Sequence, residues 1–235
     1  MVRSLIVAVG CLVLAACGAE DDAVSTKDVE AAAVNAVAAA SEDAASTDTA
    51  STGTATPSDE AGERTGTWGD IIYGDPNAPV EVIEYASLTC PHCADFAVNY
   101  FPAIKEKYVD TGKVKFVYRN FIFNRQDLAA STIARCSNPE VTRTLMKTLF
   151  ARQHEWARSQ NIIDDLASIA RQAGISRVQF DRCLANRDMH AHLVEMTKKG
   201  SEDYQVNSTP SFFIDGKSVE NWTRDLDDKL AEATE

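Results

Sequence analysis

The first 67 residues of this 235-residue chain contain no phenylalanine, tryptophan or tyrosine, while the remaining 168 contain all 18 of them. Aromatic side chains supply much of the apolar area that a folded core buries. The stretch before Trp68 therefore lacks the means to build a core of its own. We expect one folded domain over residues 68–235, a length that buries roughly 70% of its unfolded surface.

The chain is also short of basic residues, with 23 Lys and Arg against 35 Asp and Glu and a net charge of −12. Phosphate contacts need clustered Lys and Arg, so a nucleic-acid-binding function is disfavoured. The imbalance lies mostly before the predicted domain, since residues 18–66 carry 11 acidic and 2 basic side chains. The net charge therefore says little about the substrate of the folded part.

The charge-free, mostly apolar run from Ser4 to Ala16 is too short to span a bilayer, which takes about 20 residues. It favours a secretory signal peptide. Its end, Leu14-Ala15-Ala16-Cys17, resembles a bacterial lipobox, which implies removal of residues 1–16 and a lipid anchor on Cys17. Residues 17–67 then read as a disordered acidic tether. The alternative is ordinary signal cleavage, with Cys17 incidental.

Three elements open the predicted domain. Residues 80–85 are β-branched and aromatic enough for a strand, and residues 113–121 alternate as a second strand. The helix between them should bury its aromatic rings and kink at Pro102, which has no N–H to donate. A strand, a helix and a strand in this order favour a parallel pair. The helical spacing of four is seen in Phe96, Tyr100, Ile104 and Tyr108. We expect the aromatic residues of this helix, Phe101 included, to lie in the core.

Helical patterns fill residues 126–204, with breaks that predict four or five helices. The breaks fall at 137–139, 159–161, 174–176 and 186–188. A short hairpin follows, because Asp215-Gly216 separates two β-rich stretches, 212–214 and 217–219. A closing helix is marked by Trp222, Leu226 and Leu230.

The motif Cys90-Pro91-His92-Cys93 stands between the first strand and the helix. Pro91 suits the first helical position, which makes Cys90 the N-cap. Free backbone N–H groups and the helix dipole then favour the Cys90 thiolate, and His92 can add a donor or positive charge. We expect a lowered Cys90 pKa, with Cys93 as the buried resolving thiol and Cys90–Cys93 as a redox-active disulfide.

Two other interpretations of this motif are a zinc site and a purely structural disulfide. A zinc site needs four ligands, usually from a second such motif, and His190 and His192 point to different sides of a helix. A purely structural disulfide would close a strained short loop. We therefore expect no metal and no organic cofactor.

The order strand, Cys-Pro-His-Cys, helix, strand, helical insertion, Thr-Pro and β-hairpin resembles an α/β thioredoxin fold of the DsbA type. There the all-helical insertion, here about residues 126–204, separates the βαβ and ββα halves. The resemblance implies that Pro210 is a cis-proline that faces the cysteines and pairs with the backbone of the client. Thr209 departs from the best-known oxidase, which has Val, and Thr occurs at this position in reductases and isomerases too.

Glu84 lies six residues before Cys90, where thioredoxin-fold proteins often carry a buried acid. It shares strand parity with Val80 and Val82, so we expect it to face the core and relay the proton of Cys93. The alternative is a solvated glutamate. Arg119 on the neighbouring strand is a candidate partner for it.

Four cysteines remain if Cys11 is cleaved and Cys17 is lipidated, and the motif leaves Cys136 and Cys183 as a second pair. An export signal favours a structural Cys136–Cys183 disulfide, as in some family members, over two free buried thiols.

The predicted function is a protein-disulfide oxidoreductase that introduces disulfide bonds into exported proteins. We expect a monomer on the periplasmic side, lipid-anchored to either membrane, and the resemblance implies a DsbB-type membrane partner as re-oxidase. One alternative is a reductase or isomerase of the same fold, which Thr209 keeps open. The other is a non-catalytic client-binding lipoprotein, in which Cys90 would resist alkylation at acid pH.

Overall fold

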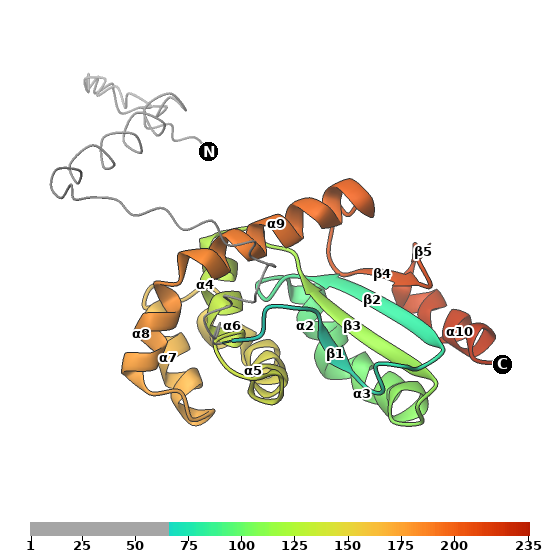
Figure 1. Ribbon diagram of the computed structural model, residues 1–235, viewed down its shortest axis with the longest axis horizontal. Coiled ribbons are helices and arrows are strands. Elements are labelled where there is room, and N and C mark those ends of the chain that lie inside the picture. Colours follow the sequence, from blue (N-terminus) through green and yellow to red (C-terminus); the bar gives the residue numbers. More distant parts are fainter. Residues whose placement is uncertain (1–65) are drawn as a thin grey trace, which may run out of the picture. The chain divides into compact units, whose positions relative to one another are not determined.

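A computed structural model describes residues 66–235, so the predicted signal peptide, Cys11, Cys17 and nearly all of the tether lie outside the described residues. Within that part of the chain, no helix is both long and apolar enough to cross a membrane. The core is a five-stranded sheet in the order β1-β3-β2-β4-β5 (Figure 1). The strands are β1 (Ile71–Tyr73), β2 (Val80–Ala86), β3 (Val114–Asn120), β4 (Ser211–Ile214) and β5 (Lys217–Val219).

The predicted parallel pair is confirmed, because β2 and β3 run parallel with Glu84 opposite Tyr118. The other three pairings are antiparallel. β1, which pairs Ile71 with Tyr118 at the edge, was not predicted from the sequence. Its three residues are too few to show an alternating pattern.

The helix that begins in the cysteine motif widens twice from α-helical to π-helical hydrogen bonding. It runs through α2 (Pro91–Asp95), the π-helix η1 (Phe96–Tyr100), α3 (Phe101–Ile104) and the π-helix η2 (Lys105–Val109). Pro102 lacks an N–H, and the Phe101 N–H bonds to the carbonyl of Phe96 five residues back. The wider turn changes the helical phase, so Tyr100 is 40% exposed and its predicted place in the core is wrong.

This helix and α10 (Trp222–Ala233) cover one face of the sheet, where Phe96, Phe116 and Phe212 pack together. The predicted hairpin is confirmed between β4 and β5. Asp215 (φ 46°) and Gly216 (φ 77°) both adopt the left-handed backbone that such a turn requires.

The insertion forms a helical half beside the sheet (Figure 1). Each predicted break contains the N-cap residue of the helix that follows, and the side chains of Asn138, Ser176 and Asn186 accept a backbone N–H from that helix. The sequence predicts four or five helices here, and the insertion has six because the single turn α6 was not predicted. They are α4 (Arg125–Ala134), α5 (Pro139–Ala151), α6 (Gln153–Trp156), α7 (Ile162–Gln172), α8 (Arg177–Leu184) and α9 (Arg187–Asp203).

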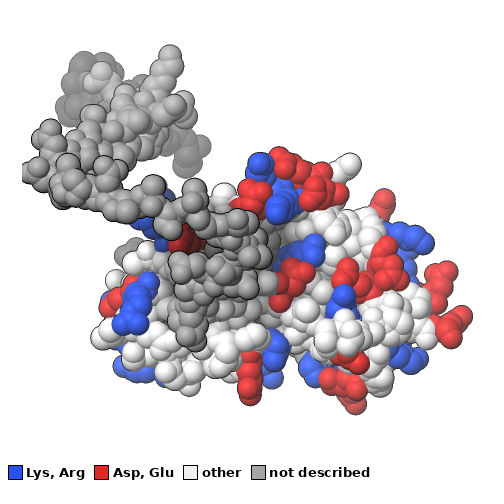
Figure 2. Space-filling model, in the orientation of Figure 1, with Lys and Arg blue, Asp and Glu red and all other residues white. Residues whose placement is uncertain are grey.

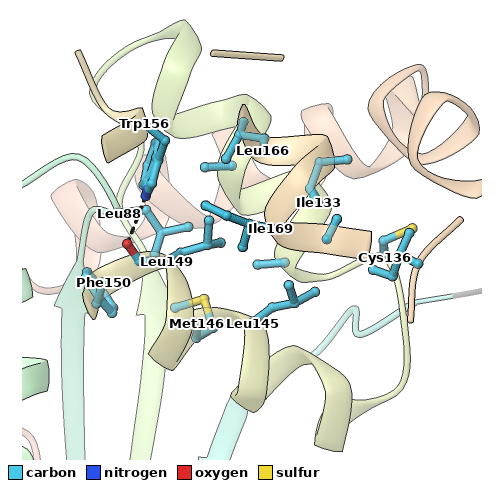
Figure 3. Packing of buried hydrophobic residues seen from close by; sticks show 14 of the residues in the cluster. Leu88, Ile133, Cys136, Leu145, Met146, Leu149, Phe150, Trp156, Leu166 and Ile169 are labelled. Atoms are coloured by element: carbon cyan, nitrogen blue, oxygen red, sulfur yellow. Dashed lines mark hydrogen bonds between the residues drawn. The ribbon is translucent and has the colours of Figure 1, made fainter. Parts of the chain in front are cut away.

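Trp156 stands inside the core of the insertion, fully buried, and donates to the carbonyl of Leu149 at 2.9 Å (Figure 3). Helix α9 runs from the insertion towards the other face of the sheet (Figure 1). There Gly200 lies against the ring of Tyr85, where an added Cβ would come within 2.7 Å. This close approach explains a glycine in the middle of a long helix.

Arg135 is fully buried at the junction of the two halves, which the sequence did not reveal. Its guanidinium donates to Asn120 Oδ1 at 2.7 Å and to the carbonyls of Thr67 and Gly69 at 2.9 and 2.7 Å. Thr67, assigned to the tether from the sequence, is buried and donates its N–H to the Arg135 carbonyl at 2.8 Å. On the face shown in Figure 2, acidic and basic side chains are interspersed.

Cys136 and Cys183 form a disulfide with their Cα atoms 5.7 Å apart, which joins the end of α4 to α8 across 47 residues. Changing both residues to Ala should lower the free energy of unfolding by about 4 kcal/mol, because the unfolded chain regains the entropy of the open loop. Denaturant titration measures this. A double variant as stable as the parent protein would contradict a structural role, and the reactivity of Cys90 serves as the control that the site is intact.

Candidate active site

Cys90 occupies the N-cap of α2, with an extended backbone (φ −82°, ψ 121°) and Pro91 at the first helical position. The cap position follows from the sequence, because Pro91 loses nothing where a helix has no partner for its N–H. The Cys90 side chain is half-buried and that of Cys93 is fully buried. The pair therefore has one sulfur within reach of a client and one behind it.

The pKa of Cys90 is lowered to about 5. A hydrogen bond from the Cys93 thiol is the largest cause, and partial burial opposes it. The Thr209 hydroxyl and the backbone N–H groups of Cys93 and His92 lower the pKa further. His92 thus contributes through its backbone N–H at the start of the helix.

The loop before β4 faces this sulfur. The peptide bond between Thr209 and Pro210 is cis, as the resemblance implied, and the Cys90 thiol donates to the Thr209 carbonyl at 3.2 Å. The Thr209 hydroxyl is buried without a hydrogen-bond partner among residues 66–235. It lies near enough to both sulfurs to lower the pKa of each.

Two further acidic groups lie behind Cys90. Burial, the hydrogen bond to Cys90 and the charge of Glu84 hold the pKa of Cys93 well above its usual range. Glu84 is 4% exposed, so the predicted core orientation is confirmed. Burial raises its pKa strongly, and the charge of Cys90 adds to the effect. Both groups therefore favour their protonated forms, as a proton relay requires.

Arg119 does not contact Glu84, and that predicted pairing is wrong. Glu84 stands opposite Tyr118, so the next residue along β3 points to the other face of the sheet. There Arg119 forms two hydrogen bonds of 2.8 Å with Asp70 and one of 3.1 Å with the Tyr85 hydroxyl. The Glu84 carboxyl therefore lies on the face of the sheet that carries the cysteines, and Arg119 lies on the opposite face.

The insertion holds the loop that carries Cys90. Buried Asp127, on α4, accepts the N–H groups of Leu88 at 2.9 Å and Phe123 at 3.2 Å. Gln153, at the start of α6, donates to the carbonyls of Leu88 and Cys90 at 2.8 and 3.0 Å. Sequence reasoning missed both residues, because no motif marks a side chain that bonds to a distant backbone.

Within residues 66–235, no three His, Cys, Asp or Glu side chains gather closely enough to hold a metal ion. The thioredoxin family model matches residues 67–230 of this chain. The chain belongs to the thioredoxin family. The matched residues include the cysteine pair at the start of α2 and the cis-proline loop described above.

Among curated proteins, this thioredoxin-family chain is 37% identical over 157 residues to a Rickettsia conorii protein named protein-disulfide oxidoreductase. The match covers 66% of this chain and 57% of that protein, so the chain spans less than two thirds of the relative's length. Disulfide bond formation protein D of Bacillus subtilis is 24% identical over 164 residues, covering 66% of this chain and 71% of that protein.

Among solved structures, α-DsbA1 of Wolbachia pipientis is 29% identical with a TM-score of 0.62, covering 72% of this chain and 95% of that one. A protein-disulfide isomerase of Novosphingobium aromaticivorans is 28% identical with a TM-score of 0.63, covering 71% and 98%. The predicted thioredoxin fold with a DsbA-type insertion is therefore confirmed.

The Thr209 hydroxyl should matter to the thiolate more than to the fold. Thr209→Val keeps the shape of the side chain and removes the donor, so the pKa of Cys90 should rise by about one unit. The rate of iodoacetamide alkylation against pH measures the pKa, from a starting value of about 5. Thr209→Ser, which keeps the donor, is the matched control. An unchanged profile in the Val variant would show that the hydroxyl does not act on the sulfur.

Proposed function

We propose that this protein is a thiol–disulfide oxidoreductase that oxidises pairs of cysteine thiols in exported proteins. The stabilised thiolate of Cys90, with its pKa lowered to about 5, carries the proposal. A thiolate that is favoured in the reduced enzyme is a good leaving group, and its disulfide is correspondingly a strong oxidant. The names of the Rickettsia and Bacillus relatives support the same reaction.

The reaction starts with the Cys90–Cys93 disulfide. A client thiolate attacks the half-buried Cys90 sulfur, the bond to Cys93 breaks, and Cys93 leaves as a thiolate that takes up a proton. A second client thiolate then attacks the client sulfur of the mixed disulfide and releases Cys90 as a thiolate. The client loses two electrons and two protons, of which one stays on Cys93 and one enters the solvent.

The cis-proline loop supplies the client's position. Pro210 directly follows Thr209, whose carbonyl accepts a hydrogen bond from the Cys90 sulfur. A client backbone laid along this loop would present its cysteine to the exposed sulfur and not to buried Cys93. We assign Thr209 and Pro210 to client binding on this ground.

Export, lipidation at Cys17 and a DsbB-type re-oxidase complete the proposal. The signal-like start and the lipobox support the first two, and the Cys136–Cys183 disulfide fits an oxidising compartment. A tether of about 50 residues would let the domain reach clients some distance from a membrane.

A reductase or isomerase of the same fold is the second candidate. Thr209 keeps it open, because Thr occurs at this position in reductases and isomerases of the fold, and one structural neighbour is named a protein-disulfide isomerase. The two candidates share the same fold and differ in the redox equilibrium of the Cys90–Cys93 pair.

Equilibration of the purified protein with a glutathione series, followed by thiol trapping, separates them. We expect a reduction potential near about −120 mV, because the Cys90 thiolate is strongly stabilised. A potential near about −230 mV or below would contradict the oxidase and favour the reductase. Cys136→Ala/Cys183→Ala confirms that the measured couple is the active-site pair.

Glu84 should act on rate, since Cys93 is buried and must gain its proton from inside the protein. Glu84→Gln keeps the shape and removes the acid, so reduction of the disulfide by a client dithiol should slow about tenfold or more. The slowing should be greatest at high pH, where solvent supplies few protons. Rapid acid quenching and thiol trapping measure the rate.

Glu81→Gln is the matched control, because Glu81 lies on the same strand in an ion pair with Lys115 at 2.6 Å. Equal rates in the Glu84 variant and the parent protein would rule out the relay.

A further inference from the structure

A groove of about 350 Å³ lies between the π-bulged helix and α5, away from the cis-proline loop. Its volume is in the range of small-molecule sites. One wall is the segment where Pro102 forces the change of hydrogen bonding, and π-bulges are frequent at functional sites. Six of the residues that line it are aromatic: Tyr73, Phe96, Phe101, Phe116, Tyr118 and Phe150.

Glu84 also lines this groove. Its carboxyl is buried, and Oε1 has no hydrogen-bond partner within residues 66–235. A buried polar atom without a partner costs free energy that a bound donor would recover. Glu84 therefore offers the groove a buried acceptor among mostly aromatic side chains.

The rim carries positive charge from Arg143 and Lys147 on α5. Neither forms an ion pair with a residue of the described part of the chain, and Arg143 donates to the carbonyl of Ile72 at 3.2 Å. Lys105, also on the rim, is paired with Asp110 at 2.5 Å, and Glu140 supplies the one acidic side chain there. The balance of charge favours an anionic group at the mouth.

We propose that this groove binds a small phenolic acid, with its ring among the aromatic side chains, its hydroxyl donating to Glu84 and its carboxylate against Arg143 and Lys147. Three independent features select this one class. The rings require a flat apolar body, the carboxyl oxygen requires a donor at the deep end, and the two cations require an anion at the mouth. Glu84 is also the proposed relay residue, but the binding test below has no redox readout, so its outcome is distinguishable from that of the proposed oxidase.

Calorimetric titration of the full-length protein with para-hydroxyphenylpropionate tests the proposal, with phenylpropionate as the matched probe that lacks the donor. We expect saturable binding of the first probe, about tenfold tighter than the second, because only the hydroxyl reaches Glu84. Equal affinities, or no saturation with either probe, would overturn the proposal.

Two variants locate the site. Thr144→Trp fills the groove from the exposed rim of α5 and should abolish binding. Lys147→Glu should weaken it about threefold, while Lys147→Arg keeps the charge and the affinity. Melting temperatures and the alkylation rate of Cys90 check that each variant is folded. Binding that survives Thr144→Trp would place the probe elsewhere and contradict the proposal.

Discussion

The site depends on where one negative charge resides in a cluster of three buried or half-buried acidic groups. Cys90, Cys93 and Glu84 influence one another, and burial disfavours the charged form of each. Only Cys90 stands at the N-terminus of a helix, where backbone N–H groups are free to bond to an anion. The charge therefore settles on the one sulfur that a client can reach.

This arrangement also explains why the neutral members of the cluster matter. The Cys93 thiol donates to the Cys90 thiolate, so a protonated Cys93 is itself the largest support of the charge. Burial is the main reason that the pKa of Cys93 is high, and it keeps that donor in place. The Cys90 thiolate and the protonated Cys93 thiol thus stabilise each other's protonation states.

The helical insertion acts on this cluster through the backbone before Cys90. Asp127 and Gln153 bond to both N–H and carbonyl groups of the loop, and they come from helices that follow the motif by more than thirty residues. Burial raises the pKa of Asp127 to about 6, so holding it as a carboxylate above that pH costs folding free energy. Its hydrogen bonds to the loop offset part of that cost, which suggests that loop placement is what Asp127 is for.

Much of the fold was predictable, because its signals are local. N-caps such as Asn138 and Asn186, the turn at Asp215-Gly216 and the alternation in β3 are all set by neighbouring residues. The π-helices were not predictable from the sequence. Aromatic residues spaced four apart indicate a regular α-helix and give no sign of the extra residue that exposes Tyr100. The predicted pairing of Arg119 with Glu84 was wrong for a related reason, because its actual partner, Asp70, lies just before a strand that was not predicted. Arg135 became visible only once the two halves were packed together.

Glu84 connects the cysteine pair to the aromatic groove, because its carboxyl borders both. Its β2 position fixes it on the face of the sheet that carries the helix of the motif, and the π-bulge of that helix forms a wall of the groove. A hydroxyl bound at Oε1 would favour the ionised carboxyl, and a charge on Glu84 disfavours the thiolate of Cys90. Occupation of the groove would then make the reduced enzyme less stable, so by linkage the ligand should bind the oxidised form more tightly.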